Sequence, residues 1–266
     1  MIKSRKKYIS YFLIILTIVI VWEIFATLVG MTKRTPENIL PHLHKVLLFV
    51  FSKEKLTSEK TALQTLALNT SITLSRALIG FVIGTVVGYL MAIIMKISGV
   101  VEKILFPYLM IIQIIPVLGM APLIYSLTGD INKSRIIISV LLTFYPVAAN
   151  TLAGFNSVKK EKLELMKVLS ASKFEIFTKL LVPSSLPYFF TGLKVSAPMA
   201  MTASILVDTL QGEGGLGCLL VQSLKHAVSI YYFWSIIFLC IFIGILIYNS
   251  MKLIEKKLYK DPDFND

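Results

Sequence analysis

Six stretches of this sequence are apolar enough and long enough to cross a lipid bilayer, and this pattern constrains the fold more than any other feature. A helix needs about 20 apolar residues to span the hydrocarbon core of a membrane. Backbone groups inside lipid must find their hydrogen-bond partners within the protein, which favours helices for runs of this length. We therefore predict an all-α polytopic membrane protein with six transmembrane helices. The spans are expected at residues 8–29, 77–95, 101–127, 134–155, 188–210 and 231–251.

The composition agrees with a membrane protein and excludes several other classes. Hydrophobic residues make up 56% of the chain, whereas about 45–50% is typical of soluble domains. Lysine and arginine number 27 against 15 acidic residues, an excess that suits cytoplasmic loops. No basic face is interleaved with stacking aromatics, so no nucleic-acid partner is expected. Cys218 and Cys240 show no metal-ligand spacing, and nothing in the sequence calls for a cofactor.

The positive charges predict the orientation of the chain in a bacterial cell membrane. A cluster of basic residues precedes the first span, and no small-residue cleavage site follows it, so we expect a retained helix that starts in the cytoplasm. A second basic cluster follows the last span. Both termini are therefore expected in the cytoplasm. The two clusters are Lys3, Arg5, Lys6 and Lys7, and Lys252, Lys256, Lys257 and Lys260.

Three segments are expected along the chain. Residues 1–60 hold the first helix and an external segment, 61–258 form the transmembrane domain with a polar cytoplasmic loop at 159–187, and 259–266 form a cytoplasmic tail. Residues 42–51 are predicted to form a short amphipathic helix on the outer surface. His42 and His44 are two positions apart, which places them on different sides of a helix, so no metal site is expected there.

Several residues inside the spans are candidates for packing or for a translocation path. Gly80, Gly84 and Gly88 form a ridge of small residues that lets another helix approach closely. Prolines interrupt the third span around a polar amide, which fits either a wall of the path or a structural kink. Lys194 is expected to extend its amine toward the membrane surface. The candidate path residues are Gln113, Pro116, Asn150, Pro198 and Asp208.

The polar loop divides into two short amphipathic parts. Residues 164–187 are rich in lysine and cannot lie within a bilayer. Leu163, Met166 and Leu169 recur at helical spacing, which predicts a short helix. Serines at 170 and 172 then favour a bend, and a second amphipathic run is expected to stop at Pro183, because proline is a poor residue inside a helix.

The loop resembles the EAA loop of ABC importer permeases, which has a glutamate, two small residues, a glycine, and a hydrophobic–x–hydrophobic–Pro ending. The corresponding residues are Glu164, Leu165, Met166, Ser170, Leu180, Val182 and Pro183. Leu165 and Met166 replace alanines, and Ser170 replaces a glycine that would make a left-handed turn easily. An ordinary amphipathic loop of another membrane protein is the alternative.

The resemblance extends over most of the chain, from about residue 22 to residue 257. It is to the permeases that serve binding-protein-dependent uptake of sulfonates, taurine, nitrate, and pyrimidine or flavin vitamin precursors. The matching pieces are Trp22-Glu23, Leu40-Pro41, residues 71–76 with the glycine ridge, Ile115-Pro116, Ala121-Pro122-Leu123, Phe144-Tyr145-Pro146, Asn150-Thr151 with Gly154, Leu186-Pro187, Gly192-Leu193 and Gly215-Leu216-Gly217. Tyr125-Ser126-Leu127 departs from these relatives, which usually carry a tryptophan there.

The resemblance implies a permease homodimer joined to two ATPase subunits and an external binding protein. It also implies that the loop docks on the ATPase through a coupling helix. The residues expected to couple are Glu164, Leu165, Met166, Leu169, Ser170, Ala171 and Ser172. The chain has no GxxxxGK[ST] phosphate loop, so ATP hydrolysis is expected on a separate subunit and this chain is not expected to be an enzyme.

Two other classes of protein remain as alternatives. A secondary transporter or channel usually has coupling carboxylates in mid-membrane and often two related halves, and neither is visible. A membrane enzyme would need a nucleophile with a base partner, and the histidines are scattered. The GxGxxG spacing at Gly212, Gly214 and Gly217 is not expected to bind a dinucleotide, because it follows a membrane span instead of a strand.

Overall fold

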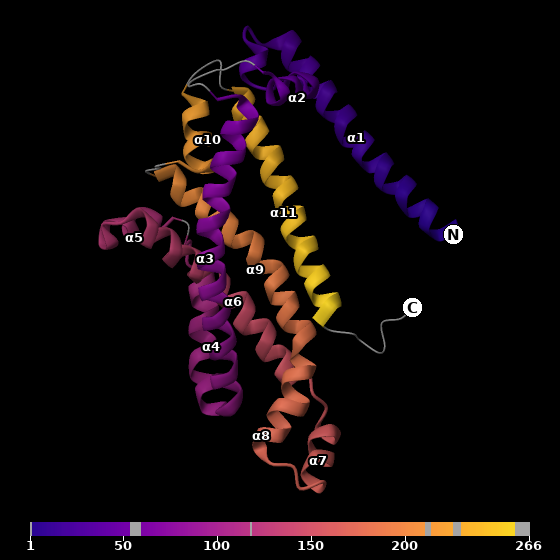
Figure 1. The fold of residues 1–266 in the computed structure, drawn as a ribbon, viewed down its shortest axis with the longest axis vertical. Coiled ribbons are helices and arrows are strands. Elements are labelled where there is room, and N and C mark those ends of the chain that lie inside the picture. Colours follow the sequence, from indigo (N-terminus) through magenta and orange to yellow (C-terminus); the bar gives the residue numbers. More distant parts are fainter. Residues whose placement is uncertain (1, 54–59, 118, 211–213, 226–229, 259–266) are drawn as a thin grey trace.

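The computed structural model describes residues 2–53, 60–117, 119–210, 214–225 and 230–258, and this part of the chain is mostly helical and contains no strand (Figure 1). This agrees with the predicted all-α class. The helices, with a 3₁₀ turn η1 and a π-helical turn η2, are α1 Ile2–Thr32, η1 Pro36–Asn38, α2 Leu43–Phe51, α3 Ala62–Ile97, α4 Gly99–Ile114, α5 Ala121–Thr128, α6 Ile131–Asn156, α7 Lys160–Val168, α8 Lys173–Ile176, η2 Phe177–Leu181, α9 Val182–Leu210, α10 Leu216–Leu224 and α11 Ile230–Leu258.

The predicted third span is divided, and the count of six spans is not confirmed. Five helices in the described part of the chain are long and apolar enough to cross a membrane. Residues 101–127 instead form α4 and α5 with an irregular connection. Ile115 precedes Pro116 and is extended, with ψ 131°, because the proline ring disfavours helical backbone before it. Pro122 is accommodated in the first turn of α5, where helices tolerate proline.

The centre of the bundle is formed by α3, α6 and α9, and α6 packs against both of the others. The glycine ridge makes the contact between α3 and α6 possible. A Cβ added to Gly80 would lie 2.2 Å from the Cβ of Ser139, and one added to Gly88 would lie 2.4 Å from the carbonyl oxygen of Phe144. The predicted role of this ridge as a packing face is confirmed.

The prediction that Pro183 ends a helix is wrong. The chain remains helical from Lys173 through η2 and α9 to Leu210. The amide of Val182 bonds to the carbonyl of Phe177, five residues earlier, so the turn before the proline is a π-helix. Proline has no N–H to donate, and its ring crowds the preceding turn of an ordinary α-helix. The wider π turn changes the hydrogen-bonding register just before Pro183, and helices are known to accommodate local disruptions in this way. Helix α8 is therefore joined to α9 without a break in the helix.

Helix α1 stands apart from the bundle and meets it near the end that carries α2 (Figure 1). Trp22 on α1 donates its indole N–H to the carbonyl of Pro41 over 3.0 Å and packs edge-on against Trp234 of α11. Glu37 accepts hydrogen bonds from Lys45 and Tyr231, and the bond from Lys45 holds the pKa of Glu37 below its usual value. The predicted short helix at 42–51 is present as α2, Leu43–Phe51.

The two histidines at the start of α2 lie closer together than the sequence predicts. His42 is the N-cap residue, with ψ 142°, and so lies outside the helical repeat on which the prediction relied. Its ring stacks on that of His44, with centroids 5.5 Å apart. The expectation that they occupy different sides of a helix is therefore wrong.

Candidate functional site

Helices α7 and α8 form a hairpin that projects from the end of the bundle opposite α2 (Figure 1). Helix α7 ends in a left-handed turn at Ser170, whose φ is 56°. The amide of Ala171 bonds to the carbonyl of Met166, and the amide of Ser170 to that of Lys167, which is the Schellman pattern. The turn that glycine makes easily is thus present here with serine.

Ser170→Gly is expected to stabilise this turn, since left-handed backbone costs an ordinary residue roughly 1–2 kcal/mol and glycine's own entropy cost offsets part of it. We expect the turn to become more stable by about 1 kcal/mol. Hydrogen exchange of the amides at positions 170 and 171 should then slow about fivefold. Ser170→Val should speed that exchange, because a β-branched residue tolerates positive φ poorly. Equal exchange in the two variants would contradict a strained turn.

Helix α8 begins at a capping box. The hydroxyl of Ser172 accepts the amide of Glu175 over 3.2 Å, and the carboxylate of Glu175 accepts the amide of Ser172 over 3.0 Å. Lys179 lies one turn further on and donates to the same carboxylate over 2.9 Å. Ser172 therefore fixes the direction in which the chain leaves the bend.

The projecting hairpin leaves an apolar surface uncovered. Leu163 and Met166 are half-buried, and Leu163 packs into a core cluster that includes Phe155, which holds α7 against the bundle. Leu165 is 59% exposed and Leu169 is 67% exposed. We define the docking face as Leu165, Val168, Leu169 and Phe174, all of which are exposed. Exposed apolar surface with a charged rim is typical of protein–protein contacts.

Glu164 lies beside the docking face on α7 and is exposed. Within the described part of the chain it makes no hydrogen bond or ion pair, so its carboxylate is available to a partner. Exposed lysines lie at positions 160, 162 and 167 of α7 and at position 173 of α8. A charged and apolar projection of this kind suits a docking element.

A buried charge cluster lies where α3, α6 and α9 meet the segment before α10. Asp208 of α9 is fully buried, and Arg135 of α6 is 1% exposed. The Nε of Arg135 lies 2.7 Å from Oδ1 of Asp208, and Arg76 of α3 approaches the same oxygen at 3.5 Å. Thr73 donates to Oδ2 of Asp208 over 3.0 Å and accepts the amide of Leu216 over 2.8 Å. The cluster connects four segments of the chain.

Arg135, which lies at the start of the predicted span 134–155, was not singled out from the sequence. A partial indication was present in the sequence, because Arg76, Arg135 and Asp208 all lie near the same predicted end of their spans. Charged groups in a membrane bundle are costly unless they are paired, so an acid in one span predicts a basic partner in another. Which arginine approaches most closely depends on how the helices are packed.

The candidate path residues do not form one cluster. Gln113 and Pro116 are exposed at the end of α4 and after it, whereas Pro198 and Asp208 lie on α9. Asn150 donates to the carbonyl of Pro146 within α6. Among the described residues, no hydrogen bond or ion pair joins any two of these five.

Lys194 forms an ion pair that was not predicted from the sequence. Its amine lies 3.0 Å from Oε2 of Glu255 on α11, and both side chains are largely buried. This ion pair ties α9 to the end of α11.

These features define a class: a multi-pass helical membrane protein with a helical hairpin that projects from one end of the bundle. The sequence profile of the family described as "Binding-protein-dependent transport system inner membrane component" matches residues 84–260. The chain belongs to this family.

Similar proteins and a solved structure agree with this assignment. The chain is 28% identical over 212 residues to the formylaminopyrimidine transport permease protein ThiX of Halalkalibacterium halodurans, covering 77% of each chain. It is 25% identical over 214 residues to the nitrate import permease protein NrtB of Synechococcus elongatus, covering 80% of this chain and 75% of that one. An inward-facing structure of the MetNI methionine ABC transporter shares the fold, with TM-score 0.65 and 15% identity over 77% of this chain and 100% of that chain.

The protein is therefore a membrane-embedded permease subunit of an ATP-driven ABC importer. In such systems the permease works with ATPase and binding-protein subunits, and ATP hydrolysis takes place on the separate ATPase. The permease is not itself an enzyme.

Proposed function

We propose that the α7–α8 hairpin is the coupling element of this permease and docks on an ATPase subunit. The supporting observation is the exposed docking face on α7 and α8, held against the bundle by Leu163. The proposed coupling residues are Glu164, Leu165, Met166, Leu169, Ser170, Ala171 and Ser172. Because η2 joins the hairpin to α9 without a break, a movement of the ATPase would be carried directly into a central helix.

The proposed assembly is a permease homodimer with two ATPase subunits and one external binding protein. The hairpin then lies in the cytoplasm, together with both chain termini, and α2 lies on the outer side of the bacterial inner membrane. Basic residues are in excess in the hairpin and near both chain termini, and this excess supports the orientation.

The proposed cargo is a small solute of the sulfonate, nitrate or vitamin-precursor class. Similar permeases are described for formylaminopyrimidine, nitrate and aliphatic sulfonates. We propose that the solute passes between helices near Gln113, Pro116, Asn150 and Pro198. These helices would open alternately to the two sides of the membrane. Asp208 contributes through the charge cluster, which holds α9 against α3 and α6.

Affinity purification from native membranes in mild detergent tests this function. We expect an ATPase carrying a phosphate loop to be recovered with the tagged chain, and we expect solute uptake in vesicles to require ATP and the binding protein. Recovery of the chain alone, in a form that moves a solute in liposomes without ATP, would favour a secondary transporter or channel instead.

A further inference from the structure

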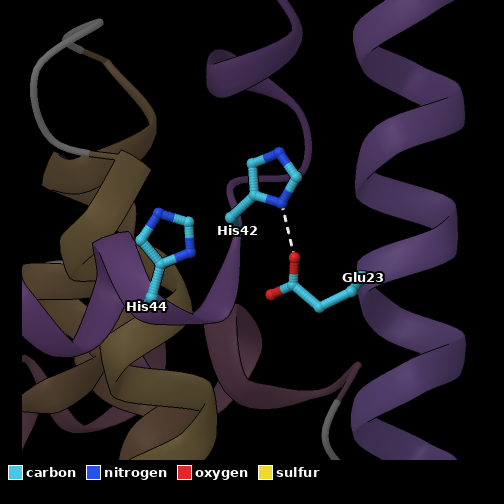
Figure 2. Close-up of side chains that lie close together, drawn as sticks. All are labelled: Glu23, His42 and His44. Atoms are coloured by element: carbon cyan, nitrogen blue, oxygen red, sulfur yellow. Dashed lines mark hydrogen bonds and ion pairs between the residues drawn. The ribbon is translucent and has the colours of Figure 1, made fainter.

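We propose that Glu23, His42 and His44 form a binding site for one divalent transition-metal ion of the Zn²⁺ type, at the junction of α1 and α2. This inference does not depend on the transport function. Figure 2 shows the carboxylate of Glu23 reaching from α1 toward the two imidazole rings. Each of the three residues offers one ligand atom, and these atoms all lie within 4.8 Å of one another.

The ligand set fits this class of ion. Imidazole nitrogens combined with one carboxylate are typical of zinc and neighbouring transition metals, whereas calcium and magnesium prefer oxygen ligands alone. Zinc–nitrogen and zinc–oxygen bonds are about 2.0–2.2 Å, so two ligands of one ion lie about 3–4 Å apart. The Nδ1 of His42 now lies 2.5 Å from Oε2 of Glu23. Side-chain movements of about 1 Å would therefore seat the ion.

The ion would take the place of the hydrogen now shared by His42 and Glu23. An ionised carboxylate only accepts hydrogen bonds, so Nδ1 of His42 is the donor in the metal-free pair. Metal binding requires the ring hydrogen to move to Nε2, which frees the Nδ1 lone pair. His44 is exposed, so water has access to complete the coordination.

The backbone around the site is already held in place. The second oxygen of Glu23 accepts the amide of Leu43 over 2.9 Å, and its neighbour Trp22 bonds to the carbonyl of Pro41. Lys45 follows His44 in sequence, but its amine is paired with Glu37. The ligands therefore come from α1 and from the start of α2 with its N-cap residue, whose approach is fixed without the metal, and the ion would link α1 to α2.

Calorimetric titration with ZnCl₂ and visible absorption with CoCl₂ test the proposal on the full chain in detergent, purified with a tag that contains no histidine. We expect one ion per chain. His44→Ala should weaken binding by about 100-fold or more, since loss of even an outer-shell partner costs roughly 10–100-fold. Glu23→Gln should weaken it as well, while its amide oxygen can still accept the Leu43 amide.

His226→Ala is the matched control, because His226 is the remaining histidine of the chain and lies outside the described residues. Zinc should raise the unfolding temperature of the parent and of this control, and should leave that of His44→Ala unchanged. Absence of binding in the parent, or binding that survives in His44→Ala, would overturn the proposal and leave Glu23 and His42 as a simple hydrogen-bonded pair.

Discussion

Asp208→Ala is expected to destabilise the folded protein by about 3–5 kcal/mol, the usual cost of removing one partner from a buried ion pair. The guanidinium of Arg135 would remain 1% exposed with no carboxylate beside it. The hydroxyl of Thr73 would also lose the carboxylate to which it donates. The same hydroxyl accepts the amide of Leu216, so that contact would lose its support. We expect a large fall in the unfolding temperature of the purified chain in detergent, and little accumulation of the variant in membranes.

The double variant Asp208→Ala with Arg135→Met separates an unpaired charge from a lost contact. Replacing both partners of a buried pair with apolar residues is often close to neutral, so the double variant should be more stable than Asp208→Ala alone. Glu161→Ala serves as a control because this acid is exposed on α7. Equal loss of stability in the single and double variants would show that the charge pair is not the cause.

Charge substitutions on the docking face are expected to abolish ATP-driven uptake while leaving the permease folded. In Leu165→Glu with Leu169→Glu, two carboxylates would replace apolar side chains that are 59% and 67% exposed. Loss of one apolar anchor from a protein interface costs about 2 kcal/mol or more, a factor of roughly 30 in affinity. We therefore expect the ATPase to be lost from the purified complex. Glu164→Lys should uncouple uptake in the same manner.

Ile97→Glu is the matched control for the docking face. Ile97 is also exposed and apolar, at the end of α3, and it is not part of the hairpin. Recovery of the ATPase and the rate of uptake in vesicles are the measurements, with unfolding temperature as the check on folding. Uptake that persists in Glu164→Lys and in the double-leucine variant would count heavily against docking through α7.

Local patterns in the sequence were sufficient for much of the architecture. Apolar runs of about 20 residues predicted five helices that the structure contains. The spacing of Gly80, Gly84 and Gly88 predicted a packing face, and α3 uses it against α6. The leucine spacing in the polar loop predicted the short helix α7. Each of these patterns depends on residues within a few turns of one another, so a single segment carries the whole signal.

Other features were decided by the tertiary structure, because they depend on residues far apart in the chain or on the turn beside them. Arg135 and Asp208 are a pair only because α6 and α9 pack together, and His42 reaches His44 only because it caps α2 from outside the helix. Pro183 continues a helix because a π turn precedes it. The sequence alone determined most of the helical segments and the apolar ones, while packing determined which buried charges meet, and the local turn geometry determined where a proline is tolerated.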